Sequence, residues 1–153
     1  MIFKQYAQDP EVTRFLTWRP HQSIDQTRQF VRRCLLGWQQ GTPLAWAITR
    51  IDEDVVLGMV EVRLGEGAEL GYVLARAEWG KGYMTEAVRA VIEQALALPP
   101  TYRVAAICDV ENAASARVME KVGMLREGIL RRAVLHPNIS AEPRDAYICA
   151  RTR

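Results

Sequence analysis

Two glycines flank a lysine at Gly80-Lys81-Gly82, between a strand-like segment and the most regular helical pattern of the chain. Glycine allows positive φ angles and a close approach of the backbone to a ligand. The N-terminus of the following helix offers unpaired N–H groups and the positive end of the helix dipole. This arrangement suits a pyrophosphate. It is neither a Walker A loop nor a Rossmann fingerprint, which would need glycine at Thr85. A plain tight turn before a core helix is the alternative.

The composition indicates one ordinary globular domain. The chain has 153 residues, which suits a single domain over residues 1–153. Its net charge is only +2, with both signs mixed along the chain, so we expect no nucleic-acid partner. The cysteines lack a C-x-x-C pair and the histidines lie far apart, so we expect no disulfide and no metal site. These residues are Cys34, Cys108, Cys149, His21 and His136.

The sequence shows no targeting signal. Its first residues do not resemble a signal peptide, and no apolar run approaches the roughly 20 residues needed to span a bilayer. We therefore expect a cytoplasmic protein without a membrane partner.

The first half of the chain predicts a helix followed by three strands. Ser23 is a good N-cap for a segment whose apolar residues recur at helical spacing, and Gly41 ends that segment. Residues 44–48, 55–62 and 68–75 read as strands. The turns between them are too short for crossovers, so they predict an antiparallel meander.

The second half changes to alternating strands and helices. Residues 84–95 carry apolar side chains at i, i+3 and i+4 spacing, and Pro99-Pro100 stops this helix. The wholly apolar segment 104–108 suits a strand that is buried on both faces. The remaining predicted elements are a helix over 111–122 and strands over 125–135 and 144–150. Together these elements predict a mixed α/β layer fold.

Two segments resemble the GNAT superfamily of acetyltransferases. Residues 69–87, ELGYVLARAEWGKGYMTEA, are similar to its acetyl-CoA-binding motif, and residues 109–124, DVENAASARVMEKVGM, are similar to its next block. Two sequence patterns, and the turn at residues 18–21, resemble the RimJ/RimL-type branch. The patterns are W-G-K-G-Y-x-T-E-A and N-x-x-S-x-R-V-x-E-K-x-G-[FM]. The resemblance covers nearly the whole chain. It implies a largely antiparallel GNAT-like sheet with helices on both faces, and acetyl-CoA as co-substrate without a metal.

Three features depart from the superfamily's pattern. Ala77 stands where the first loop position is often Gln or Arg. Met119 stands where many members have a tyrosine that protonates the departing thiolate. Residues 2–6 already read as the first helix, so we expect the superfamily's first strand to be missing, with a truncated start and an uncovered sheet edge as the two alternatives. An uncovered sheet edge could then favour a dimer over a monomer.

The resemblance implies direct attack of an amine on the thioester and assigns residues to the steps. Glu69 is the first candidate base, with Glu61 as backup, although either could be a solvated or ion-paired strand residue. Ser115 would relay a proton to the sulfur in place of the missing tyrosine, and its alternative is a plain helix residue. Asn112 would hold pantetheine or water, and its alternative is a helix N-cap. The expected cofactor-binding residues are Val73, Leu74, Gly80, Lys81, Gly82, Tyr83, Met84, Thr85, Asn112 and Ser115.

The acceptor is constrained by the free energy of losing a proton. Holding a lysine neutral at pH 7 costs roughly 4.6 kcal/mol, whereas an α-amine costs only about 1 kcal/mol. A site without a strong base therefore favours a protein N-terminal α-amine, of the ribosomal-protein type, and Trp18 has the best position among the tryptophans to meet it. Alternatives are a small-molecule amine acetyltransferase and a catalytically silent acyl-CoA-binding module. A nucleotide-binding or purely structural domain fits the second motif poorly.

Overall fold

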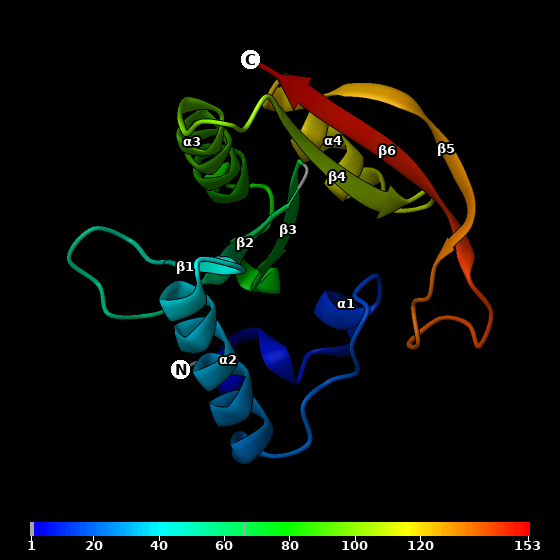
Figure 1. The fold of residues 1–153 in the computed structure, drawn as a ribbon. Coiled ribbons are helices and arrows are strands. Elements are labelled where there is room, and N and C mark those ends of the chain that lie inside the picture. Colours follow the sequence, from blue (N-terminus) through cyan, green and yellow to red (C-terminus); the bar gives the residue numbers. More distant parts are fainter. Residues whose placement is uncertain (1, 66) are drawn as a thin grey trace.

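The protein forms one mixed sheet with helices on both faces. The computed structural model describes residues 2–65 and 67–153 (Figure 1). The six-stranded sheet has the order β1-β2-β3-β4-β6-β5. Its strands are β1 (Leu44–Ile48), β2 (Gly58–Leu64), β3 (Ala68–Leu74), β4 (Arg103–Asp109), β5 (Leu125–Val134) and β6 (Arg144–Thr152). The helices are η1 (Phe3–Ala7), α1 (Pro10–Thr13), α2 (Ile24–Gln40), η2 (Arg76–Glu78), α3 (Tyr83–Ala97) and α4 (Ala113–Lys121).

The pairing of β3 with β4 is the only parallel one in this sheet, and it is short. It joins Ala68 to Val104, Glu69 to Ala105 and Leu70 to Ala106, and then it stops. The other neighbouring strands run antiparallel. Because β3 continues for four residues beyond Leu70 and β4 for three beyond Ala106, the two strands diverge and leave a gap at the centre of the sheet.

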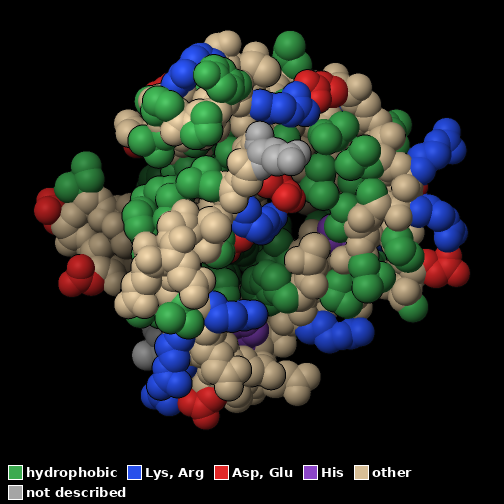
Figure 2. Space-filling model, viewed as in Figure 1, with side chains coloured by type: hydrophobic (Ala, Val, Ile, Leu, Met, Phe, Trp, Pro, Cys, Tyr) green, Lys and Arg blue, Asp and Glu red, His purple; other side chains and the backbone are tan. Residues whose placement is uncertain are grey.

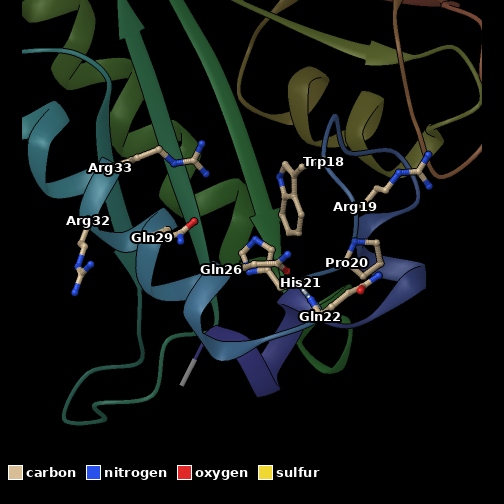
Figure 3. A pocket seen from close by; sticks show the side chains of 9 residues that line it. All are labelled: Trp18, Arg19, Pro20, His21, Gln22, Gln26, Gln29, Arg32 and Arg33. Carbon is tan, nitrogen blue, oxygen red and sulfur yellow. Dashed lines mark hydrogen bonds between the residues drawn. The ribbon is translucent and has the colours of Figure 1, made fainter.

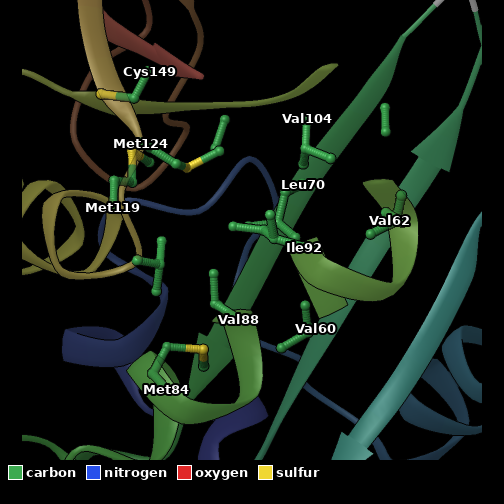
Figure 4. Close-up of a cluster of buried hydrophobic side chains, with 14 of the residues drawn as sticks. Val60, Val62, Leu70, Met84, Val88, Ile92, Val104, Met119, Met124 and Cys149 are labelled. Carbon is green, nitrogen blue, oxygen red and sulfur yellow. The ribbon is translucent and has the colours of Figure 1, made fainter. Parts of the chain in front are cut away.

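Each face of the sheet has its own apolar cluster. On one face, Val60, Leu70 and Val104 pack against Val88 and Ile92 of α3, and α4 adds to the same cluster (Figure 4). The opposite face presents Met59 and Ala45 to Tyr6 and Cys34 from the N-terminal helices. The period-two alternation of strands β1 and β2 thus sends neighbouring residues to different helices.

Local signals explain the ends of the helices. The Ser23 hydroxyl accepts a hydrogen bond from the Gln26 N–H at 3.4 Å, and Gly41 ends α2 with φ +84°. Helix α3 ends before Pro99-Pro100. The Trp38 indole N–H donates to the Ala45 carbonyl at 2.8 Å, so α2 covers part of the edge strand β1.

The fold, its antiparallel meander and its helices on both faces are confirmed, with shifts at some boundaries. The strand predicted over 55–62 begins only at Gly58. Strand β4 alternates between buried and half-buried residues and is not buried on both faces. The helix predicted over 111–122 is shorter because Asn112 caps it. Residues 3–7 form a π-helical turn, and no strand precedes α2 in the described part of the chain.

Candidate active site

The gap between β3 and β4 opens into a cavity of about 1160 Å³. Figure 2 shows a deep hollow on this face, lined by hydrophobic side chains and bordered by Lys and Arg side chains. Its walls come from β3, the Trp79–Thr85 region, the end of β4, the first turns of α4 and the N-terminal segment around Phe15 and Trp18. The predicted residues that line it are Glu69, Val73, Leu74, Gly80, Gly82, Met84, Thr85, Asn112 and Ser115.

The open edge of β3 carries backbone groups that are not paired with β4. Backbone groups alternate in direction along an antiparallel strand, and the Ala75 N–H donates to the carbonyl of Leu57, in the segment before β2, at 2.7 Å. The N–H groups of Tyr72 and Leu74 therefore point into the gap, whereas that of Val73 points toward β2. The Leu74 carbonyl also points away from β2 and accepts a hydrogen bond from the Trp79 indole at 2.9 Å.

The N-terminus of α3 differs from those of α2 and α4. Side chains cap α2 and α4 through Ser23 and Asn112, but α3 begins after Gly82 without a side-chain cap. Gly80 and Gly82 have φ angles of +75° and +89°, and no heavy atom lies within 4 Å of a Cβ built on either one. The turn is thus open on the side where a ligand would approach. The first amides of α3, at residues 83–85, have no partner within the helix and fit a pyrophosphate.

A buried carboxylate that also lines the cavity holds this turn in place. Glu78 is only 8% exposed and accepts hydrogen bonds from Arg50 at 2.7 Å and Lys81 at 3.1 Å. The hydrogen bond from Lys81, together with Arg50, holds the pKa of Glu78 below its usual range. Arg50 also donates to the Tyr83 hydroxyl at 3.2 Å. The side chains of Lys81 and Tyr83 therefore support the turn, and neither lines the cavity.

Ser115 and Tyr72 face each other across the gap. Their hydroxyl oxygens lie 2.6 Å apart, and the Tyr72 hydroxyl is also 3.2 Å from the Ser115 carbonyl. Burial raises the pKa of Tyr72, so the phenol keeps its proton. The sequence motifs did not indicate a role for Tyr72, although it lies inside the first motif, because its partner is 43 residues away.

The two candidate bases are linked through one arginine. Arg63 lies 3.0 Å from Glu69 and 2.6 Å from Glu61, and all three side chains line the cavity. Glu69 is the more accessible, with 52% of its side chain exposed against 27% for Glu61. Glu69 and Glu61 are therefore both ion-paired and both part of the cavity wall.

The end of β4 holds a buried ionic cluster around Asp109, the first residue of the second motif, and the motif alone does not reveal its partners. Asp109 is 1% exposed and accepts a hydrogen bond from Arg144 at 2.6 Å. Burial alone would raise the pKa of Asp109, but the hydrogen bond and charge of Arg144 outweigh burial and hold the pKa below its usual range. His136 Nε2 lies 3.6 Å from the same carboxylate, and both residues line the cavity.

The structure also gives the positions of the remaining residues that the sequence analysis named. Asn112 caps α4, since its side-chain oxygen accepts from the Ser115 N–H at 3.1 Å. Met119 is fully buried in the core and Ala77 is exposed in η2. Glu86 is exposed in the first turn of α3, where a carboxylate complements the helix dipole. Trp18 lines the cavity and packs on His21, with ring centroids 5.1 Å apart.

The described residues of the site form neither a metal-binding cluster nor a reactive cysteine thiolate. Among residues 2–65 and 67–153, no three His, Cys, Asp or Glu side chains gather where they could hold a metal ion. Burial raises the pKa of the Cys108 thiol, which lines the cavity, to about 11. Cys108 is therefore a poor thiolate nucleophile at neutral pH. Over the same described ranges, no helix has the length and apolarity needed to cross a membrane.

Comparison with known proteins agrees with this geometry. A family model described as an acetyltransferase (GNAT) domain matches residues 1–125. An uncharacterized N-acetyltransferase p20 of Bacillus licheniformis is 30% identical over 135 residues, or 85% of this chain and 75% of that protein. A ribosomal-protein-serine acetyltransferase of Escherichia coli is 28% identical over 116 residues, or 73% of this chain and 64% of that protein.

The fold also matches solved structures. One is RimL, a ribosomal L7/L12 α-N-protein acetyltransferase in complex with coenzyme A. It superposes with a TM-score of 0.86 at 22% identity, over 99% of this chain and 86% of that one. The match to the family, and a cleft that ends at an open helix N-terminus, lead to one conclusion: the chain belongs to the GNAT family and is an acetyl-CoA-dependent N-acetyltransferase.

Proposed function

We propose that this enzyme acetylates the α-amine at the N-terminus of a protein, by direct attack of the amine. The observation that carries the proposal is the continuity of the cavity. It extends from the open turn of α3, past Ser115 and Glu69, to Arg14 and Trp18 in the N-terminal segment. A cavity that continues beyond the reacting groups can hold the residues that follow a terminal amine.

The backbone of this chain would hold the acetyl donor at two places. The first amides of α3 would bind the pyrophosphate, and the N–H groups of Tyr72 and Leu74, which face the gap, would bind the pantetheine arm and the acetyl oxygen. Bound acetyl-CoA supplies the thioester that the amine attacks. Val73, whose N–H points toward β2, would contribute through its side chain, because the residue lines the cavity.

Ser115 would relay a proton to the leaving sulfur: its hydroxyl hydrogen would go to the thiolate, and the proton that Glu69 takes from the amine would return to the serine oxygen through solvent. When Tyr72 donates its hydrogen to the Ser115 oxygen, the Ser115 hydrogen stays free to point to another acceptor in the cavity. The phenol thereby fixes the direction of the serine hydroxyl. This arrangement would replace the tyrosine that Met119 cannot supply.

Glu69 would take the proton of the amine, directly or through water, with Glu61 as the alternative. Arg63 holds both carboxylates at the cavity wall. An α-amine needs only about 1 kcal/mol to lose its proton at pH 7, which suits a carboxylate that is already paired. The relative named as a ribosomal-protein-serine acetyltransferase supports the same class of acceptor.

Acetyl transfer to matched peptides tests the proposal. One peptide has a free N-terminal serine and no lysine, and the other has a blocked N-terminus and one internal lysine. We expect thiol release and a mass increase of one acetyl group with the first peptide only. Acetylation of small amines alone would favour the small-molecule alternative. Thermal stabilisation by acetyl-CoA without turnover of any amine would favour a silent binding module, since a bound ligand at 100 times its Kd adds about 2.7 kcal/mol.

A further inference from the structure

A second cavity adjoins the acceptor end of the active site. It has a volume of about 690 Å³ and lies between the loop at residues 18–22 and the first turns of α2 (Figure 3). Trp18, His21 and Arg33 line both cavities, so the two share a wall. A chain that leaves the cleft beside Trp18 would enter this second cavity.

Positive charge dominates its lining. Arg19, Arg32 and Arg33 line it, together with three glutamines, and its lining contains no carboxylate. Within the described part of the chain, none of these three arginines forms an ion pair, whereas Arg28 on the same helix pairs with Asp25 at 2.9 Å. In Figure 3, Arg19 and Arg33 lie on either side of Trp18, and Arg32 extends away from them. Guanidinium groups remain protonated at any physiological pH, so this charge is permanent.

The histidine at the shared wall does not add to this charge. Burial, and secondarily the charge of Arg33, lower the pKa of His21. Its Nδ1 lies 2.8 Å from the Thr27 hydroxyl. Arg33 and His21 both line the wall that separates the two cavities, so the positive charge of Arg33 lies at that wall.

The glutamines add hydrogen-bonding capacity. The side-chain oxygen of Gln26 accepts from the Gln22 N–H at 2.7 Å, which leaves its NH₂ group available as a donor. Donors of this kind, beside planar guanidinium groups, suit carboxylate oxygens.

We infer that this second cavity binds acidic side chains that follow the α-amine of the acceptor, so that the enzyme selects protein N-termini with Asp or Glu behind the first residue. The inference rests on the proposed function, and it names the acceptor class of that site. The permanent positive charge of Arg19, Arg32 and Arg33 attracts an acidic segment and disfavours a basic one.

Three peptides with the same N-terminal serine test it, with Asp-Glu-Asp, Ala-Gly-Ala or Lys-Arg-Lys at positions 2–4. We expect kcat/KM for the acidic peptide to exceed that for the neutral one by about fivefold to tenfold at low salt, and the ratio to fall as salt screens the charges. The double substitution Arg19→Gln with Arg33→Gln should bring the ratio close to one. Arg28→Gln, on the same helix but outside the lining, should leave it unchanged.

Calorimetric measurement of the binding of the same peptides, in the presence of coenzyme A, separates the selection of acidic N-termini from the proposed acetylation of protein N-termini. Equal turnover of all three peptides would overturn the inference and leave the proposed function standing. If no peptide is acetylated, the proposed function fails and with it the selection of acceptors. Tighter binding of the acidic peptide, lost in the double variant, would then still show that the second cavity binds acidic side chains, and equal binding of all three peptides would overturn that as well. Inorganic phosphate that displaces the acidic peptide more strongly than chloride of equal ionic strength would point to a phosphate ligand and overturn the peptide assignment.

Discussion

The hydroxyl groups of Tyr72 and Ser115 lie 2.6 Å apart, one on the strand that borders the gap and the other in the first turn of α4. Because β3 and β4 are no longer paired at this point, this hydrogen bond is a direct link across the opening. It ties the wall that would hold the acetyl group to the helix that would supply the proton.

Replacing Ser115 by Ala should lower kcat by about 10²-fold, the lower end of the range for general acid catalysis. The KM for acetyl-CoA should change little, because Ser115 would act on the leaving group. Tyr72→Phe should lower kcat by about tenfold, since it frees the serine hydroxyl to rotate without removing it. Steady-state kinetics over a range of pH would measure both effects.

Tyr147→Phe is the matched control, because Tyr147 stacks under Arg126 outside the cavity. It should leave kcat unchanged. A Tyr72→Phe enzyme with the activity of the unmodified protein would show that Ser115 needs no help from the phenol.

Glu78→Gln should raise the KM for acetyl-CoA by about fivefold and affect kcat less. The substitution keeps the shape of the side chain but removes the charge that holds Arg50 and Lys81, so the turn before α3 loses its support. Titration of acetyl-CoA by calorimetry would report the loss directly. Glu120→Gln, which breaks an exposed pair with Arg126, should not change the affinity, and an equal loss in both variants would contradict this role for Glu78.

Asp109→Asn should lower the free energy of unfolding by about 3 kcal/mol at neutral pH, because it leaves Arg144 without its buried partner. Urea denaturation would measure this change. The folded-state pKa of Asp109 is depressed, so its contribution to stability is present above the unfolded pKa of about 3.9 and is lost as the pH falls through the folded value. The stability of the unmodified protein should therefore fall more steeply with acid than that of Asp109→Asn. Parallel curves for the two proteins would contradict this account.

Short-range patterns in the sequence predict most of the fold correctly. The cap at Ser23 and the apolar stripe of α3 depend on residues three or four apart, so the amino-acid order alone reveals them. The apolar residues of segment 55–57 predict a strand, but β2 begins only at Gly58. Leu57 is buried and its backbone bonds to Ile48 and Ala75, whereas Val55 is exposed, so the apolar pattern places the start of the strand too early.

The site is only partly predictable, because several of its contacts join residues that are far apart in the sequence. The glycine turn and Asn112 lie in contiguous motifs. Arg50, which pairs with Glu78, and Arg144, which pairs with Asp109, are 28 and 35 residues away along the chain, and each pair meets only when the sheet has formed. The Val73 N–H points toward β2 because of the register in which β3 pairs with β2. The amino-acid types in β3 do not specify that register.

Gly82→Ala tests the open turn of α3, and Gly41→Ala provides a control with nearly the same backbone strain. The two glycines have φ angles of +89° and +84°, and a Cβ at either one would meet no heavy atom within 4 Å. Each substitution should therefore lower the free energy of unfolding by a similar amount, about 1 kcal/mol. Only Gly82→Ala puts a methyl group where a pyrophosphate would approach, so it alone should weaken acetyl-CoA binding, by about tenfold or more. Thermal shifts with and without acetyl-CoA separate the two effects, because the shift on adding the ligand should persist in Gly41→Ala and shrink in Gly82→Ala. An undiminished shift in Gly82→Ala would mean that the phosphates bind elsewhere.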